Sequence, residues 1–239
     1  MNTKKYQDLS LERIAANYKR DELLQMYWYF HPRFRFIKSA PSGSKVLDVG
    51  AGSGGMAYWK EWRSPNRKDI QLYAIDFNKG EHFDLYDDYQ IGNIEEVEFK
   101  FKQKFDALIL SHLLEHISEP EKLLMRLQKI MNPGALIYIE VPTPSTLELP
   151  SREYFLKNNI EVSTINFFDD NSHIQTYSLE TLKEMLHKSQ LSPIENGLIQ
   201  NRYLGPVLYD YGVKNKDSEL TTYGSWLQLN WAHYVIAKK

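Results

Sequence analysis

The chain has 239 residues, a length that one hydrophobic core with its surrounding helices can fill. Its 29 lysines and arginines are offset by 31 aspartates and glutamates, so the formal charge is −2 and no overall positive field favours nucleic acid. The absence of cysteine excludes disulfides and thiolate chemistry and restricts any metal site to histidines and carboxylates. The N-terminal segment MNTKKYQDLS has no apolar core after its lysines, and no apolar run approaches the ~20 residues that span a bilayer, so we expect a cytoplasmic protein.

The first predicted element is an N-terminal helical extension over residues 1–40. Residues 9–30 form a helix-like mixture of apolar and charged residues, and an aromatic and basic segment follows at 31–36. The turn Pro41-Ser42-Gly43 then separates this extension from the rest of the chain. We expect the extension to act as a lid or packing helix ahead of a sheet.

Short apolar runs then alternate with helical stretches. Strands are predicted over 45–50, 71–76, 89–93, 105–112 and 135–141, and helices over 55–62 and 118–131. Such alternation is typical of right-handed βαβ units and a parallel sheet. In the second helix, Ser118 and Glu121 have the spacing of a capping box, and Asn132-Pro133-Gly134 predicts its end.

The pattern loosens after Val141. Residues 143–172 are long for a connection in a compact domain, so we expect a functional insertion that contacts substrate. A helix is predicted over Leu179–Lys188 with Ser178 as its N-cap, followed by strands near 193–200 and 230–237. The Tyr- and Gly-rich residues 202–225 between these strands are predicted to be a loop, and residues 41–239 to be one globular unit.

A glycine-rich segment, Val46–Gly55, follows a predicted strand and opens a predicted helix. Its glycines permit a tight turn and let the backbone approach a ligand closely. The dinucleotide pattern G-x-G-x-x-G is formally present with Gly55 as its third glycine, but Asp48 at the strand end suits a cationic ligand such as the amino group or sulfonium of S-adenosylmethionine. The residues expected to hold this cofactor here are Asp48, Gly50, Ala51, Gly52 and Gly54.

These residues resemble the first motif of the class I S-adenosylmethionine-dependent methyltransferases, which reads apolar-apolar-Asp-apolar-Gly-x-Gly-x-Gly. Segment 72–76 resembles the second strand of that family, which implies that Asp76 binds the ribose diol and Phe77 packs on adenine. Gly92-Asn93-Ile94 stands where the family often carries Gly-Asp-apolar, so Asn93 and Ile94 are expected at the adenine edge.

Two further segments extend the resemblance over about residues 44–192. Segment 105–112 resembles the fourth strand, which places Ser111 at the cofactor, and Asn132-Pro133-Gly134 resembles the entry to the fifth. The implied fold class is α/β, a Rossmann-like, seven-stranded, mostly parallel sheet flanked by helices, with insertions after strands 5 and 6.

The segment Ser111–His116 stands at the carboxyl edge of the predicted sheet, where ligands bind in such folds. If it is helical, His112, Glu115 and His116 share one face, and His173 can fold back over the same edge after the insertion. This pattern is similar to metal-dependent small-RNA 2′-O-methyltransferases, in which Glu-x-x-Glu-His and a later His hold a divalent ion, and to ubiquinone-pathway O-methyltransferases in the same loop. The resemblance implies a metal site of His112, Glu115, His116 and His173.

The three imidazoles of that site favour Fe²⁺, Mn²⁺ or Zn²⁺ over Mg²⁺. The alternative is that the glutamate and histidines only tie the loop by hydrogen bonds. With a metal, the ion would activate an acceptor hydroxyl; without one, His112 or His173 would be the catalytic general base.

We therefore interpret the chain as an S-adenosylmethionine-dependent O-methyltransferase. Its acceptor is expected to be a sugar or another small molecule, as in bacterial glycan or secondary-metabolite pathways, because the charge balance argues against nucleic acid. Three alternatives stay open: an RNA 2′-O-methyltransferase, a non-catalytic methyltransferase-like binding subunit, and a nicotinamide-dependent reductase.

Overall fold

The computed structural model describes residues 17–239, and its contacts group the chain into two compact units. The first, here called the sheet unit, comprises Pro32–Pro142, Ile174–Gly197 and His233–Lys239. The second, the helical unit, comprises the described residues up to His31 together with Thr143–His173 and Leu198–Ala232. In this grouping the insertion and the segment between the last two strands associate with the N-terminal helix, and one globular unit over residues 41–239 stays a prediction. Residues 9–16 of the predicted extension lie outside the described part of the chain.

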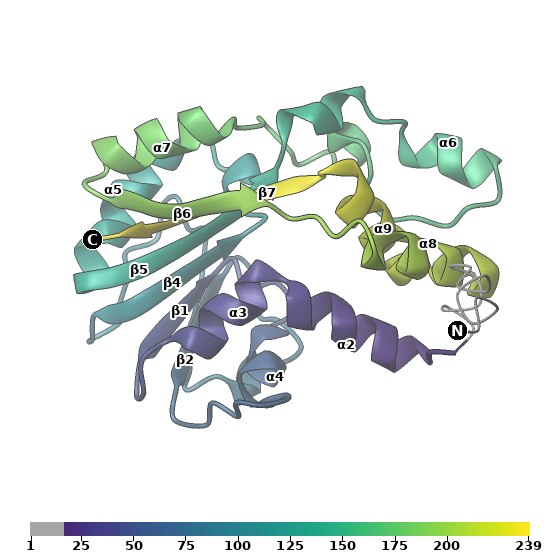
Figure 1. The fold of residues 1–239 in the computed structure, drawn as a ribbon. Helices are drawn as coiled ribbons and strands as arrows, with labels where there is room; N and C mark the ends of the chain where they lie inside the picture. Colours follow the sequence, from purple (N-terminus) through teal and green to yellow (C-terminus); the bar gives the residue numbers. More distant parts are fainter. Residues whose placement is uncertain (1–16) are drawn as a thin grey trace, which may run out of the picture. The chain divides into compact units, whose positions relative to one another are not determined.

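The sheet unit contains a seven-stranded sheet in the order β3-β2-β1-β4-β5-β7-β6 (Figure 1). The pairs β1–β2, β1–β4, β2–β3 and β4–β5 are parallel, which confirms the predicted mostly parallel α/β sheet. The strands are β1 Lys45–Val49, β2 Gln71–Asp76, β3 Asp88–Ile91, β4 Phe105–Ser111, β5 Met131–Pro142, β6 Ser192–Leu198 and β7 Ala232–Lys238.

The central strands are apolar over nearly their whole length because helices cover both of their faces. Val46, Leu47 and Val49 of β1 have no exposed surface, and Leu108, Ile109 and Leu110 of β4 have none either. Burial at consecutive positions explains why these segments read as continuous apolar runs in the sequence. Parallel register sets Asp48 beside Ala74 and Ile109, so the carboxyl ends of β1, β2 and β4 meet at one edge of the sheet.

Four helices of the sheet unit flank the sheet. In Figure 1, α5 (Pro120–Ile130) and α7 (Leu179–Lys188) lie over one face, and α3 (Pro32–Ser39) and α4 (Met56–Glu61) over the other. The predicted bounds of α7 are confirmed, and the Ser178 hydroxyl accepts the Thr181 N–H at 3.1 Å as its N-cap. Leu182, Met185 and Leu186 form the buried side of this helix, so its amphipathic spacing holds it on the sheet.

The start of α5 differs from the prediction. The capping box of Ser118 and Glu121 is absent, since Glu119 is the N-cap and Pro120 begins the helix. Proline suits the first helical position because its missing N–H would have no partner there. The Ser118 N–H instead donates to the Glu95 carboxylate at 2.9 Å, so a long-range contact replaces the local one.

The predicted loop over 202–225 is wrong, because this segment folds into two helices, α8 (Leu204–Asn215) and α9 (Ser218–Leu229). Asp217 is the N-cap of α9 and accepts the Leu220 N–H at 3.0 Å. A side-chain carbon added at Gly212 would overlap the Thr221 backbone, so this glycine lets the two helices approach closely. The glycines that resembled loop residues therefore serve helix packing.

The helical unit contains α8 and α9 with α2 (Arg20–Phe30) and the insertion. The insertion forms η4 (Pro144–Glu148), α6 (Arg152–Lys157) and η5 (Phe167–Asp169). Trp226 and Trp231 stack at 4.2 Å, and their indole N–H groups donate to the carbonyls of Thr164 and Ile165 at 2.7 Å each. Within the described part of the chain, no helix has both the length and the apolar composition needed to cross a bilayer.

Candidate cofactor site

The glycine-rich loop connects β1 to α4 at the carboxyl edge of the sheet. Gly52 and Gly54 have φ angles of +55° and +86°, a left-handed backbone that glycine adopts without strain. A side-chain carbon added at Gly54 would lie 3.0 Å from Phe83 and 3.2 Å from Tyr86, whereas one at Gly52 would meet nothing within 4 Å. Gly54 is therefore packed against the protein. At Gly52, the side of the backbone where a side chain would lie faces open space, and a ligand can approach there.

Gly55 does not behave as the third glycine of a dinucleotide-binding loop. That pattern needs a third glycine for close packing between helix and strand. Gly55 has an ordinary φ of −59°, and an added side-chain carbon would meet only the Ser53 hydroxyl at 3.9 Å. The loop thus uses the spacing Gly50, Gly52 and Gly54, as the methyltransferase resemblance implied.

Asp48 lies near the end of β1 with 4% of its surface exposed. The Tyr86 hydroxyl donates to its carboxylate at 2.7 Å. Burial raises the pKa of Asp48 to about 6, although the Tyr86 hydrogen bond and the Arg33 charge act in the opposite direction. A cationic ligand beside Asp48 would favour its ionised form, which suits the ammonium and sulfonium groups of S-adenosylmethionine.

Asp76, at the end of β2, is joined to the glycine-rich loop. One of its carboxylate oxygens accepts the Gly52 N–H at 2.8 Å, and the other accepts the Asn78 N–H at 3.2 Å. Each carboxylate oxygen keeps a second acceptor position, so both can still receive ribose hydroxyls. The next side chain, Phe77, is 67% exposed and is open to stacking on a base.

Asn93 and Ile94 follow β3, and the structure gives them different surroundings. The side-chain oxygen of Asn93 accepts the Glu95 N–H at 3.1 Å, which orients the amide and leaves its NH₂ group and a second acceptor position on the oxygen for an adenine ring. Ile94 is 7% exposed and belongs to the hydrophobic core of the sheet unit. Of these two, Asn93 is the better placed to read a base edge.

Ser111 and His112 end β4. The Ser111 hydroxyl oxygen is buried and has no hydrogen-bond partner among residues 17–239, so it is available to a ligand. His112 has a φ of +51°, a left-handed backbone that is uncommon outside glycine, and its N–H donates to the Glu140 carbonyl at 2.8 Å. The turn that follows is a short 3₁₀ segment, η3 (Leu114–His116), rather than the helix that would have placed His112, Glu115 and His116 on one face.

The imidazole of His112 lies between two buried carboxylates. Its Nε2 is 2.8 Å from Glu140, and its Nδ1 is 3.3 Å from Glu115; these glutamates are 1% and 0% exposed. Burial disfavours the charged ring, but Glu140 and Glu115 together raise the pKa of His112 to about 9. The two carboxylates hold both ring nitrogens of His112, and its roles as general base and metal ligand stay predictions.

His173 belongs to the helical unit. Its Nδ1 is 2.6 Å from the Phe167 carbonyl oxygen, which can only accept, so Nδ1 carries a hydrogen, and its Nε2 lies 4.0 Å from the Asp170 carboxylate. Nε2 is thus the nitrogen that a general base or a metal ligand would use. Glu115 and His116 lie in the sheet unit, and the predicted metal role of these residues with His173 stays a prediction.

Three residues near the site were missed in the sequence: Arg33, Tyr86 and Glu140. The Glu140 carboxylate receives the Tyr138 hydroxyl at 2.7 Å and lies 3.6 Å from the Arg33 guanidinium. Arg33 also covers the Trp59 ring at 5.0 Å. A charged residue inside the apolar run of β5 was the available signal for Glu140, because such residues are rarely buried without partners.

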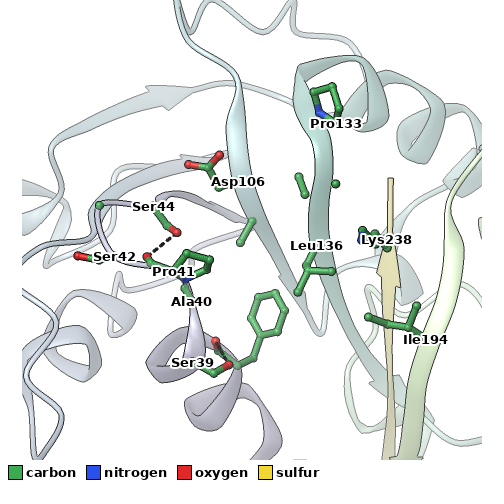
Figure 2. A pocket seen from close by; sticks show the side chains of 15 residues that line it. Ser39, Ala40, Pro41, Ser42, Ser44, Asp106, Pro133, Leu136, Ile194 and Lys238 are labelled. Atoms are coloured by element: carbon green, nitrogen blue, oxygen red, sulfur yellow. Dashed lines mark hydrogen bonds between the residues drawn. The ribbon is translucent and has the colours of Figure 1, made fainter.

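A cavity of about 510 Å³ lies at the opposite, amino-terminal edge of the strands (Figure 2). Ser44, Asp106 and Pro133 line it where β1, β4 and β5 begin. Its polar groups bond within the protein: the Ser44 hydroxyl donates to the Pro41 carbonyl at 2.7 Å, and Asp106 accepts the Lys45 N–H at 2.9 Å. This cavity is therefore separate from the glycine-rich loop.

Solved structures share this architecture. A SAM-dependent methyltransferase from Archaeoglobus fulgidus matches with a TM-score of 0.56 and 19% identity, covering 96% of this chain and 95% of that one. The plantazolicin methyltransferase BamL matches with a TM-score of 0.56 and 17% identity, covering 90% and 84%. At this identity the likeness shows the fold, a class I methyltransferase fold with the sheet order 3-2-1-4-5-7-6.

The family follows from the sequence match. The model of the methyltransferase domain family matches residues 27–196, more than half of the chain. The chain therefore belongs to this family, as a class I S-adenosylmethionine-dependent methyltransferase domain with a Rossmann-like fold.

Curated relatives are more distant. The mitochondrial ubiquinone biosynthesis O-methyltransferase of Mus musculus is 25% identical over 137 residues, which cover 54% of this chain and 36% of the relative. The ubiquinone biosynthesis O-methyltransferase of Chromobacterium violaceum is 27% identical over 119 residues, covering 48% and 49%. The chain thus spans about half or less of the length of these relatives.

Proposed function

We propose that the chain transfers the methyl group of S-adenosylmethionine to a hydroxyl of a sugar or another small molecule. The observation that carries the proposal is that two acids, Asp48 and Asp76, lie beside the glycine-rich loop at the carboxyl ends of neighbouring strands. Asp76 holds the loop through the Gly52 N–H, and Asp48 presents a buried carboxylate to a cationic group. The relatives named as O-methyltransferases support oxygen as the methylated atom.

The residues present fit this cofactor. When bound, the cofactor supplies an electrophilic methyl group on a sulfonium. Asp76 can accept the ribose hydroxyls, and Phe77 can stack on adenine. The Ser111 hydroxyl, which has no partner among residues 17–239, can donate or accept at the cofactor. The protein's part in the reaction is to align the acceptor and to remove its proton.

The proton acceptor is proposed to be His173. With its hydrogen on Nδ1, the His173 ring can take a proton on Nε2, whereas the two carboxylates beside His112 hold both nitrogens of that ring. His112 is instead proposed to hold Glu115 and Glu140 in place. A divalent ion at His112, Glu115, His116 and His173 stays a prediction, and elemental analysis of the purified protein tests it.

Calorimetric titration of the full chain with S-adenosylmethionine tests the proposal. Binding to the wild type is expected, and Asp76→Ala should weaken it about tenfold or more, because hydrogen bonds to a charged group are lost. Asp88→Asn is the matched control: Asp88 is exposed on β3 and its carboxylate accepts the N–H of its neighbour Tyr89 at 2.8 Å, so affinity should not change. Binding of a nicotinamide dinucleotide in place of S-adenosylmethionine would overturn the proposal.

Methyl transfer is then measured with isotopically labelled cofactor and a panel of sugars, phenols and other small-molecule alcohols. His173→Ala is expected to lose turnover while it keeps cofactor affinity. Turnover equal to that of the wild type would remove His173 from the reaction. Transfer of the label to RNA rather than to any small molecule would contradict the acceptor class.

A further inference from the structure

The segment that follows β2, residues 80–86, packs against the glycine-rich loop; we call it the support loop. It contains the 3₁₀ segment η2 (Phe83–Leu85). The His82 N–H donates to the Ser53 carbonyl at 2.9 Å, and a side-chain carbon added at Gly80 would overlap the Gly52 carbonyl oxygen. The support loop thus touches the backbone of the glycine-rich loop at two consecutive residues.

Tyr86, at the end of the support loop, reaches two parts of the site. Its hydroxyl donates to the Asp48 carboxylate at 2.7 Å, and its ring edge lies 3.2 Å from where a side-chain carbon of Gly54 would be. Tyr86 and Asp48 are 7% and 4% exposed, so bulk water cannot replace this hydrogen bond. One buried side chain therefore fixes both the acid of β1 and the turn that follows it.

The charged and titratable groups that face Asp48 are the Tyr86 hydroxyl, the Arg33 guanidinium and the Asp76 carboxylate. Tyr86 and Arg33 favour the ionised Asp48, whereas burial and Asp76 disfavour it. Arg33 comes from α3 and Asp76 from β2. The Tyr86 hydroxyl donates to the Asp48 carboxylate at 2.7 Å, so Tyr86 constrains the orientation of this carboxylate directly.

We propose that Tyr86 is a positioning residue for cofactor binding: its hydroxyl holds the Asp48 carboxylate toward the cationic part of S-adenosylmethionine while its ring supports the Gly54 turn. This inference rests on the proposed function. It predicts that the hydroxyl acts through Asp48, and that the effect of removing it depends on pH.

Tyr86→Phe removes the hydroxyl and keeps the ring. Calorimetry of the full chain with S-adenosylmethionine between pH 5 and pH 8 should show about tenfold weaker binding near neutral pH, the effect of losing a hydrogen bond to a charged group. The pH at which affinity falls on acidification should move upward, because Asp48 loses a donor that favours its ionised form. Tyr234→Phe is the matched control: its hydroxyl donates to the Glu195 carboxylate at the same 2.7 Å, away from the glycine-rich loop.

Asp48→Asn and the double variant Asp48→Asn/Tyr86→Phe complete the test. Asp48→Asn should flatten the pH profile, and adding Tyr86→Phe to it should weaken binding much less than in the wild-type background. Wild-type affinity and an unchanged pH profile in Tyr86→Phe would overturn the inference, as would fully additive effects. If the wild type itself fails to bind S-adenosylmethionine at every pH, the proposed function fails first.

Discussion

His112 shows how burial changes the role of a side chain that the sequence marks as reactive. Its ring lies between Glu115 and Glu140, which have almost no exposed surface. Removing a cation from beside buried carboxylates is strongly destabilising, typically by about 3–5 kcal/mol, because the charges that remain are uncompensated. Loss of activity in His112→Ala would therefore report loss of structure as well as any loss of chemistry.

His233 of β7 carries a residue-level prediction about stability. It is 3% exposed, and burial lowers its pKa to about 4 against the partial opposition of the Tyr177 backbone and Glu180. The folded state therefore binds this proton less readily than the unfolded state. The contribution of neutral His233 to the free energy of unfolding should be fully present above the ordinary histidine pKa of about 6.5. As the pH drops to about 4, the free energy of unfolding should fall by up to about 3 kcal/mol.

Chemical denaturation of the wild type and His233→Asn at several pH values between 4 and 7.5 measures this effect. The asparagine amide can donate an N–H to the Tyr177 backbone in place of the imidazole. The substitution removes Nε2, which is buried without a hydrogen-bond partner among the described residues. The difference between the two proteins isolates His233 from other groups, including Asp48, whose raised pKa acts in the opposite sense. Parallel stability profiles for the two proteins would contradict the prediction.

Site residues that are defined by local pattern could be predicted, and those defined by tertiary contact could not. Asp48 and Asp76 end consecutive strands beside a glycine-rich turn, so their place at the sheet edge follows from the sequence. Tyr86 lies 38 residues from its partner Asp48, and no periodicity connects them. The 3₁₀ segment after His112 was missed because His112 has a left-handed backbone with a φ of +51°, which helical spacing does not predict.

At the level of elements, the strands were predicted because their burial on both faces produces long apolar runs. The helices α8 and α9 were missed because their glycines and tyrosines resemble turn residues. Gly205, Gly212 and Gly224 are helical and lie where a side-chain carbon would overlap or crowd the other helix of the pair. A single sequence records the small residue but not the helix against which it packs.

The junction between the support loop and the glycine-rich loop carries a prediction for Gly80→Ala. The added carbon would overlap the Gly52 carbonyl oxygen and lie 2.6 Å from the Phe83 ring, so the backbone must shift. A shift of about 1 Å in the glycine-rich loop would misplace the groups that contact the cofactor. We therefore expect the affinity for S-adenosylmethionine, measured by calorimetry, to fall about tenfold or more.

Gly55→Ala is the control for Gly80→Ala. Gly55 lies in the same glycine-rich segment, but an added carbon would meet only the Ser53 hydroxyl at 3.9 Å, so its affinity should match that of the wild type. If Gly80→Ala also binds as the wild type does, the support loop does not position the glycine-rich loop.

On the scale of the whole molecule, the predicted cofactor residues all belong to one unit. Asp48 to Ser111 lie within Pro32–Pro142 of the sheet unit, and β1, β2 and β4 supply the strand ends that carry them. The insertion, with its predicted substrate contacts, belongs to the helical unit. The grouping of residues 143–173 and 198–232 with the N-terminal helix depends on tertiary contacts, which the sequence of a continuous chain does not reveal.

This division predicts that stability and cofactor affinity can be changed separately. Gly212→Ala places a carbon against the Thr221 backbone, and overpacking of this kind costs about 1–3 kcal/mol, more than alanine gains in helix propensity. The melting temperature should fall by several degrees, while calorimetry should give an unchanged dissociation constant for S-adenosylmethionine. Lys214→Ala, at an exposed position of the same helix, should change neither quantity. Weaker cofactor binding in Gly212→Ala alone would show that the helical unit contributes to cofactor affinity, because no predicted cofactor residue lies within it.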